Sequence, residues 1–243
     1  MPHADSRERL IVALDVPSAA AASKLVAAVG DHAGTYKVGM QLYTAEGPGF
    51  VGNLVGAGRG VFLDLKYHDI PNTVASAVRE AARLGVNMLT VHAAGGSKML
   101  SAATDAGRSS NPHLNILAVT VLTSMDEDGL HETGITGKVL DQVLRLAKTA
   151  LSAGCHGVVA SAHEASALRR EFGNDFLIVT PGVRFAGTSH GDQARVVTPS
   201  EAIQAGATHI VVGRPITEAE DPASTAKQIL QEIEQVTAKE LSL

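Results

Sequence analysis

Cysteine is nearly absent from this sequence, since Cys155 is the only one among 243 residues. A single thiol excludes a disulfide framework, a CxxC redox pair and a zinc site built from thiolates. We expect Cys155, which stands between a glycine and a histidine, to be a small core residue. The cysteine content fits the reducing cytoplasm, where we expect the protein to be located.

Long apolar runs and an excess of positive charge are also missing. No stretch approaches the ~18 consecutive apolar residues of a membrane helix, and the first ten residues, MPHADSRERL, lack the apolar core of a signal peptide. The formal net charge is −5, with 20 Lys and Arg against 25 Asp and Glu. We therefore expect neither a nucleic-acid partner nor a membrane, whereas a small anionic ligand is compatible with this charge.

Eight short β-rich runs recur along the chain, and alanine-rich amphipathic segments such as 72–85 and 136–154 separate them. The predicted strands span residues 10–15, 35–40, 61–66, 88–93, 116–123, 157–161, 176–182 and 209–213. Strands that alternate with helices indicate parallel βαβ units.

Eight such units predict an α/β protein with the (β/α)8 TIM barrel fold, in a single domain, because these barrels have about 250 residues. The alternative is a doubly wound open sheet. That fold usually has a GxGxxG motif or a P-loop after a strand, and neither follows a predicted strand here. We expect residues 1–9 to form an N-terminal tail and residues 10–243 to form the barrel domain.

Polar side chains stand at the carboxyl ends of the predicted strands, where barrels of this kind have their active sites. They are Asp15, Lys37, Asp64, Lys66, His92, Thr123, Ser161, Arg184 and Arg214. Any one of them could be an ordinary polar strand cap. Together they would share one mouth, and charges confined there are stable only when they are paired or bound to a ligand. We expect His92 to be a hydrogen-bonding member of the site wall rather than a metal ligand.

The segment 61–73, VFLDLKYHDIPNT, places two charges inside a predicted strand. Side chains alternate along a strand, so Asp64 and Lys66 share one face and apolar residues share the other. We expect the apolar face to pack against helices and the charged face to point into the barrel mouth. With Asp69, the charges form either a structural salt bridge or a catalytic array, in which carboxylates keep the lysine protonated for proton donation.

A second group of residues follows the last two predicted strands, in TPGVR (180–184) and VVGRP (211–215). Barrels frequently bind phosphate at this place, through glycine N–H groups and an arginine. The alternative is an ordinary strand end with a surface arginine. Between these segments, residues 184–195 are rich in glycine and polar residues, which is typical of a mobile loop.

Taken together, these blocks resemble the bacterial type of the orotidine 5'-phosphate decarboxylase family. FLDLKYHDIPNT, AVTVLTSM, VTPGVR, GDQ and VVGRP occur in that order, and the resemblance extends from LIVALDV to GRPIT. It implies a carboxy-lyase that converts orotidine 5'-monophosphate to UMP and CO2 in the last step of de novo pyrimidine (UMP) biosynthesis. It also implies that the reaction needs no cofactor and no metal.

The resemblance implies a role for each matching residue. Lys66 would be the proton donor, and Asp64, Asp69 and Lys37 would complete the catalytic array. Family members are dimers, so the resemblance also implies a homodimer in which Asp69 and Thr73 reach the neighbouring subunit's site. The implied substrate-binding residues include Asp64 and Thr73. Asp15 and Lys37 would bind the ribose, Thr123 would contact the pyrimidine, and the 5'-phosphate would be bound by Arg184, Gln193, Gly213 and Arg214.

Two other functions are compatible with part of this sequence pattern. A magnesium-dependent sugar-phosphate decarboxylase or synthase of the same barrel superfamily would share the DxKxxD pattern, but the DIPNT and LTSM blocks argue against it. A catalytically silent barrel that only binds a nucleotide or a protein would be expected to lose charges from the array, and Lys37, Asp64, Lys66 and Asp69 are all present.

Overall fold

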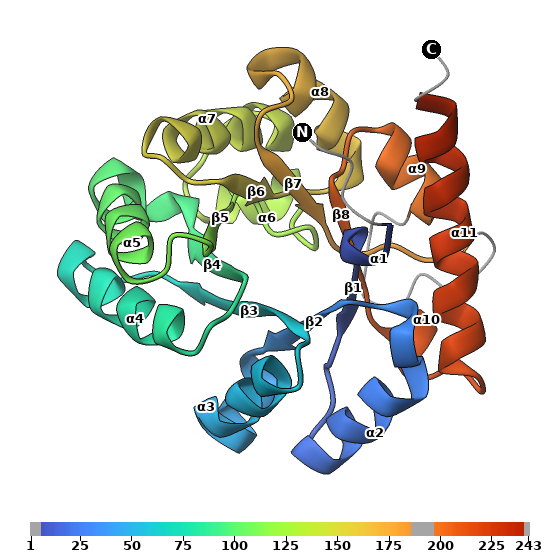
Figure 1. Cartoon of the computed structure of the whole chain (residues 1–243). Coiled ribbons are helices and arrows are strands. Elements are labelled where there is room, and N and C mark those ends of the chain that lie inside the picture. Colours follow the sequence, from blue (N-terminus) through green and yellow to red (C-terminus); the bar gives the residue numbers. More distant parts are fainter. Residues whose placement is uncertain (1–5, 186–196, 241–243) are drawn as a thin grey trace.

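The computed structural model describes residues 6–185 and 197–240. A closed barrel of parallel strands, paired in sequence order from the first to the eighth, forms its centre (Figure 1). The strands are β1 (Leu10–Ala13), β2 (Thr35–Gly39), β3 (Gly60–Tyr67), β4 (Met88–His92), β5 (Asn115–Val119), β6 (Gly157–Val159), β7 (Leu177–Thr180) and β8 (His209–Val212). The predicted (β/α)8 barrel is thus confirmed, and each predicted strand is present.

Helices surround this barrel and cover its outer surface (Figure 1). They are α1 (Ser6–Arg9), α2 (Ala19–Val29), α3 (Met40–Gly56), α4 (Pro71–Arg83), α5 (Gly96–Ser110), α6 (Glu127–Glu132), α7 (Val139–Ser152), α8 (Ala162–Phe172), α9 (Pro199–Gln204), α10 (Arg214–Thr217) and α11 (Pro222–Glu240). Two short 3-10 turns, η1 (Gly30–His32) and η2 (Ala93–Gly95), also occur. Among the described residues, no helix has both the length and the apolar character needed to cross a membrane.

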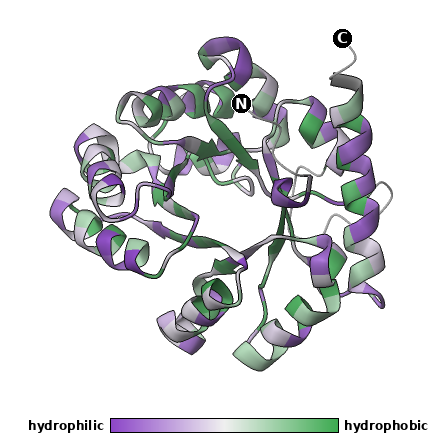
Figure 2. Cartoon of the chain, viewed as in Figure 1, coloured by the Kyte–Doolittle hydropathy of each residue, from purple (hydrophilic) through white to green (hydrophobic). Residues whose placement is uncertain are grey.

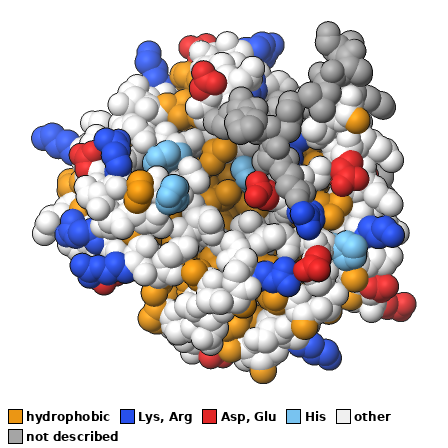
Figure 3. Space-filling view, viewed as in Figure 1, with side chains coloured by type: hydrophobic (Ala, Val, Ile, Leu, Met, Phe, Trp, Pro, Cys, Tyr) orange, Lys and Arg blue, Asp and Glu red, His pale blue; other side chains and the backbone are white. Residues whose placement is uncertain are grey.

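The apolar core has two layers, one inside the barrel and one between the strands and the helices. Alternation along β1 shows the division, because Ile11 and Ala13 belong to the cluster inside the barrel while Leu10 and Val12 belong to the outer core. In Figure 2 the strands are mostly hydrophobic, whereas the helices alternate between hydrophobic and hydrophilic residues. On the face shown in Figure 3, acidic and basic side chains are interspersed around a central hollow that exposes hydrophobic side chains.

The strand predicted over residues 116–123 is shorter in the structure. β5 ends at Val119. The backbone N–H of Thr120 still donates to the carbonyl oxygen of Val159 at 3.3 Å, and the residues after Thr120 leave the ladder. Two of them, Val121 and Leu122, line the pocket described below. Their apolar side chains therefore form part of a cavity wall and do not belong to a strand.

Polar side chains cap the amino-terminal ends of alternate strands. Each of these side chains belongs to the residue directly before β4, β6 or β8. It accepts a hydrogen bond from a backbone N–H of the neighbouring strand, β3, β5 or β7 respectively, and the donor is the second residue of that strand. The three pairs are Asn87 with Val61, His156 with Ile116 and Thr208 with Ile178, at 2.9, 3.0 and 3.0 Å. Burial, followed by the charge of Arg108, lowers the pKa of His156, which keeps its Nδ1 free to accept. The caps satisfy buried amides and fix the strands that carry the site.

The barrel closes between its first and last strands. Leu10 pairs with Ile210 and Val12 pairs with Val212. Arg9, within the predicted tail, reinforces this seam. Its guanidinium donates to the carbonyl oxygens of residues 207 and 208 at 3.2 and 3.1 Å, and to a threonine hydroxyl of α11 at 2.7 Å.

Candidate active site

A pocket of about 540 Å³ opens at the carboxyl ends of the strands. The predicted site residues that line it are Asp15, Lys37, Asp64, Lys66, Thr123, Arg184, Gly213 and Arg214. They come from positions up to two hundred residues apart in the sequence, and barrel closure brings them to one mouth. The cavity therefore has a size suited to a small-molecule ligand.

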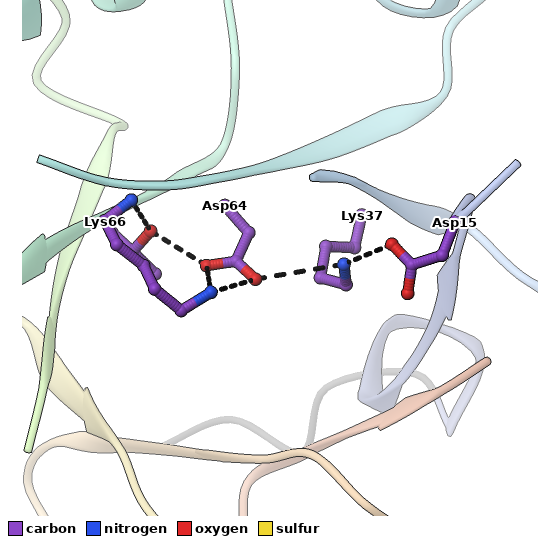
Figure 4. A network of polar contacts seen from close by, with 5 residues as sticks. Asp15, Lys37, Asp64 and Lys66 are labelled. Atoms are coloured by element: carbon purple, nitrogen blue, oxygen red, sulfur yellow. Dashed lines mark hydrogen bonds and ion pairs between the residues drawn. The ribbon is translucent and has the colours of Figure 1, made fainter. Parts of the chain in front are cut away.

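Four charged side chains of alternating sign form a row across the pocket (Figure 4). Lys37 Nζ lies 2.8 Å from Asp15 Oδ1 and 3.8 Å from Asp64 Oδ2. Lys66 Nζ lies 2.9 Å from both carboxylate oxygens of Asp64. The Asp64 carboxylate thus stands between two ammonium groups, and each charge in the row has an opposite charge beside it. Such a row holds the lysine nitrogens at fixed positions before any ligand arrives.

The backbone at Lys66 is strained. Its φ is 52°, and within the described residues it is the only residue other than glycine with a positive φ. The pairing of β3 with β4 explains this, because Leu63 pairs with Leu89 and Tyr67 pairs with Val91, so that three residues of β3 lie opposite one residue of β4. This bulge changes the direction of the lysine side chain, and it costs about 1–3 kcal/mol that the surrounding structure must offset.

Gly39 has no side chain, and this leaves room for the row of charged side chains. It is the last residue of β2 and pairs with Asp64 of β3. A methyl group at this position would lie 3.0 Å from Lys37 Nζ and 3.2 Å from Asp15 Oδ1. A side chain at Gly39 would therefore require the ion pair between Lys37 and Asp15 to shift by a few tenths of an ångström.

A second wall of the pocket, which adjoins the Asp15 end of the row, carries two guanidinium groups. Arg184 follows β7 and is only 8% exposed, while Arg214 follows β8 and is exposed. Burial and the neighbouring Arg214 lower the pKa of Arg184, and Glu218 raises it. Gly182, with a φ of 79°, turns the chain just before Arg184. Paired guanidinium groups beside glycine backbone suit an anion with several oxygens.

Between these two charged walls, the pocket is partly apolar. Thr123 lines it after β5, together with the apolar side chains of Val121, Leu122 and Val159. A flat ring can contact these apolar walls while Thr123 offers a hydroxyl for hydrogen bonding.

Three predicted site residues are absent from this pocket as the structure describes it. Asp69 and Thr73 are exposed, one on the loop after β3 and the other in the first turn of α4. The Asp69 carboxylate accepts a hydrogen bond from the backbone N–H of Ile70 at 2.6 Å. Gln193 lies outside the described residues, as does most of the predicted loop 184–195.

Two other polar strand-end residues, one of which is predicted to lie in the site wall, do not line the pocket. Ser161 caps α8, where its side chain accepts from the backbone of His163 and Glu164 completes a capping box. His92 stands beside His68, with ring centroids 5.4 Å apart, and it is not among the residues that line the pocket. Burial, followed by the charges of His68 and Lys66, lowers the pKa of His92.

Two residues in or next to the pocket could not be predicted as site residues from the sequence, because neither belongs to a recognisable motif. Glu218 lines the pocket beside the arginines, but it follows a short helix and belongs to no motif. Thr90 lies opposite the bulge, and its only sequence signal is a polar residue inside an otherwise apolar strand, MLTVH. In the part of the chain that the structure describes, no group of three or more His, Cys, Asp or Glu is placed to hold a metal ion.

Comparisons with known proteins assign the family. The model of the orotidine 5'-phosphate decarboxylase / HUMPS family matches residues 8–229. An orotidine 5'-phosphate decarboxylase of Moorella thermoacetica is 52% identical over 237 residues, which cover 95% of this chain and 94% of that protein. One of Halorhodospira halophila is 53% identical over 225 residues, which cover 93% of this chain and 95% of that protein.

A solved structure agrees with these sequence relatives. The crystal structure of orotidine 5'-phosphate decarboxylase from Lactobacillus acidophilus superposes with a TM-score of 0.84 and 40% sequence identity, covering 93% of this chain and 99% of that one. The family model's range, residues 8–229, includes all eight strands and the described residues that line the pocket. This chain belongs to the orotidine 5'-phosphate decarboxylase / HUMPS family.

Proposed function

We infer that this protein is a carboxy-lyase that converts orotidine 5'-monophosphate to UMP and CO2, the last step of de novo pyrimidine (UMP) biosynthesis. The observation that carries this function is the row of alternating charges at one wall of the pocket, with two arginines at the other. The substrate has a carboxylate at one end and a phosphate at the other, which matches the two charged walls. The similarity to named decarboxylases over 95% of the chain supports the same reaction.

The two walls suggest how the substrate lies in the pocket. We propose that the 5'-phosphate binds Arg184, Arg214 and the backbone at Gly213, with Gln193 as a further ligand. The ribose hydroxyls would contact Asp15 and Lys37. The pyrimidine would then contact Thr123, and its C6 carboxylate would face the Asp64–Lys66 pair.

Lys66 has a defined task in this arrangement. When the bond between C6 and the carboxylate breaks, CO2 leaves and the electron pair stays on C6, in an orbital that the ring does not delocalise. The Lys66 ammonium stabilises this negative charge and then donates a proton to C6, which gives UMP and a neutral lysine that takes up a proton from solvent. Its two 2.9 Å contacts with Asp64 hold it in place beforehand. Asp64 also lies where it repels the departing carboxylate.

We further propose that the enzyme is a homodimer, and that Asp69 and Thr73 act in the site of the neighbouring subunit. Between these two residues lies Ile70, which is 67% exposed. Met40, the first residue of α3 directly after the adjacent strand β2, is 56% exposed. Exposed large apolar side chains next to a charged pocket are typical of a protein interface. The exposure of Asp69 and Thr73 supports contact with a second subunit.

We propose a cytoplasmic location. Cys155 is free and buried, and burial raises the pKa of its thiol to about 12, so it is an inert core residue. A chain whose one thiol is kept reduced and buried fits a reducing compartment.

The reaction itself is tested directly with purified protein. We expect that incubation with orotidine 5'-monophosphate in excess EDTA consumes the substrate and forms UMP in equal amounts. If well-folded protein leaves the substrate intact, the proposed function is wrong. In that case the magnesium-dependent sugar-phosphate reactions of the same superfamily are to be assayed next.

Binding of the phosphate should contribute to turnover as well as to affinity. We expect Arg214→Ala to lower kcat/KM about a hundredfold, because it removes a charge-assisted hydrogen bond, and to lower kcat as well as raise KM. The reason is that phosphate binding, remote from C6, helps to order the charged row and to exclude water. Steady-state kinetics with orotidine 5'-monophosphate measure both constants.

The matched control is Arg145→Ala, which removes an exposed arginine of α7 outside the pocket. This control should keep wild-type constants. A rise in KM alone for Arg214→Ala, with kcat unchanged, would show that the phosphate contributes only to binding.

A further inference from the structure

We propose that Thr90 is a positioning residue for decarboxylation, whose hydroxyl fixes Lys66 and Asp64 relative to each other. This inference rests on the proposed function, because it concerns the same charged row. Thr90 lies in the middle of β4 and is fully buried. It is not among the residues that line the pocket, so it acts through its neighbours and not on the substrate.

The hydroxyl of Thr90 joins the two catalytic partners. The backbone N–H of Lys66 donates to Thr90 Oγ1 at 2.9 Å, and Thr90 Oγ1 donates to Asp64 Oδ1 at 3.0 Å. The chemistry sets both directions, since an amide only donates and an ionised carboxylate only accepts. One hydroxyl therefore ties the backbone of the proton donor to the carboxylate that holds its ammonium group.

The bulge explains why this link is needed. Three residues of β3 lie opposite Thr90 alone, so the regular ladder supplies no backbone carbonyl for the N–H of Lys66. Lys66 also has the strained φ of 52°. A strained conformation persists only where its surroundings determine it. The Thr90 hydroxyl satisfies the amide and holds the left-handed backbone at the residue whose side chain must reach C6.

Loss of the hydroxyl should then disturb the direction of Lys66 and leave substrate binding intact. Thr90→Val keeps the shape of the side chain and removes only the hydrogen-bonding group. We expect kcat to fall about ten- to a hundredfold, the effect of losing one hydrogen bond to a charged group, while KM for orotidine 5'-monophosphate stays within about twofold, the range left by unchanged pocket walls. Thr90→Ser keeps the hydroxyl and should recover kcat to within about threefold of wild type.

A matched control separates positioning from general stability. Thr104 is a buried threonine of α5 whose hydroxyl contacts the carbonyl oxygens of Ser101 and Ala153, both at 3.0 Å. Thr104→Val and Thr90→Val should both lower the melting temperature, because each loses a buried hydroxyl's hydrogen bonds, but Thr104→Val should leave kcat unchanged. If Thr90→Val does not fold, Thr90→Ala, which also lacks the hydroxyl, replaces it and is judged by the same constants.

The outcomes are distinct. A kcat for Thr90→Val within twofold of wild type, or a Ser variant no better than the Val variant, overturns the proposal. If the wild-type enzyme itself is inactive on orotidine 5'-monophosphate, the proposed function fails. Thr90 is then judged by the crystal structure of Thr90→Val. Movement of Lys66 out of its left-handed conformation or away from Asp64 supports positioning, and an unchanged Lys66 overturns it.

Discussion

Replacing Lys66 by alanine is expected to abolish decarboxylation, with kcat lowered by at least about 10⁴-fold. This variant loses both the proton donor and the cation beside C6, and each of these effects alone contributes about 10² or more to a rate. Binding of UMP should change much less, because the arginine wall of the pocket is untouched. The measurement is UMP formation from orotidine 5'-monophosphate in EDTA, together with titration of UMP binding.

Lys148→Ala is the control for this variant, since it removes an exposed lysine of α7 that does not line the pocket. It should retain wild-type kcat. Circular dichroism would establish that both variants fold. More than about 1% of wild-type activity in folded Lys66→Ala would mean that another group protonates C6, because general acid catalysis alone is worth more than this.

Two inactive variants, Lys66→Ala and Asp69→Ala, are expected to recover activity when they are mixed and allowed to exchange subunits. If Asp69 acts across the interface, one of the two sites in each heterodimer combines an intact Lys66 with an intact Asp69. Random pairing then restores about a quarter of all sites, since half of the dimers are mixed and half of their sites are native. Activity is measured before and after reversible dissociation of the mixture.

The control for this experiment pairs Lys66→Ala with Asp64→Ala. Asp64 and Lys66 form an ion pair within one chain, so every site of that heterodimer lacks one of them and no activity should return. If mixing with Asp69→Ala also restores nothing after proven exchange, Asp69 does not act in trans. Recovery in both mixtures would instead mean that the ion pair is assembled between subunits.

The sequence was sufficient to predict the barrel and one wall of its site. Period-two alternation in VFLDLKY separates Asp64 and Lys66 from the apolar face, and parallel strands bring their carboxyl ends together. Those two rules explain why Asp15 and Lys37 meet Asp64, although Asp15 and Asp64 are far apart in the chain. The positions of these side chains depend on strand order and on the period-two alternation, and both can be predicted from the sequence alone.

Other features depend on how strands pair, which a single sequence does not state. The bulge at Lys66 appears only in the register of β3 against β4, and the role of Thr90 follows from that register. Glu218 reaches the pocket through the path of the chain after α10, without any periodic signal. The location of Asp69 with respect to an active site requires a second subunit, and it stays a prediction.

The seam between β1 and β8 has a consequence for how the enzyme is made on the ribosome. Arg9 contacts the carbonyl of residue 208, 199 positions later in the chain, and β1 pairs with residues 210–212. At about 5–20 residues per second, translation takes about 10–40 s to supply these partners. During that interval the edge of β1 that later pairs with β8 has no partner strand, and such an apolar edge is prone to aggregation. The pocket needs Asp15 beside Gly213, which directly follows β8, so we expect a nascent chain to gain activity only after β8 has left the ribosome.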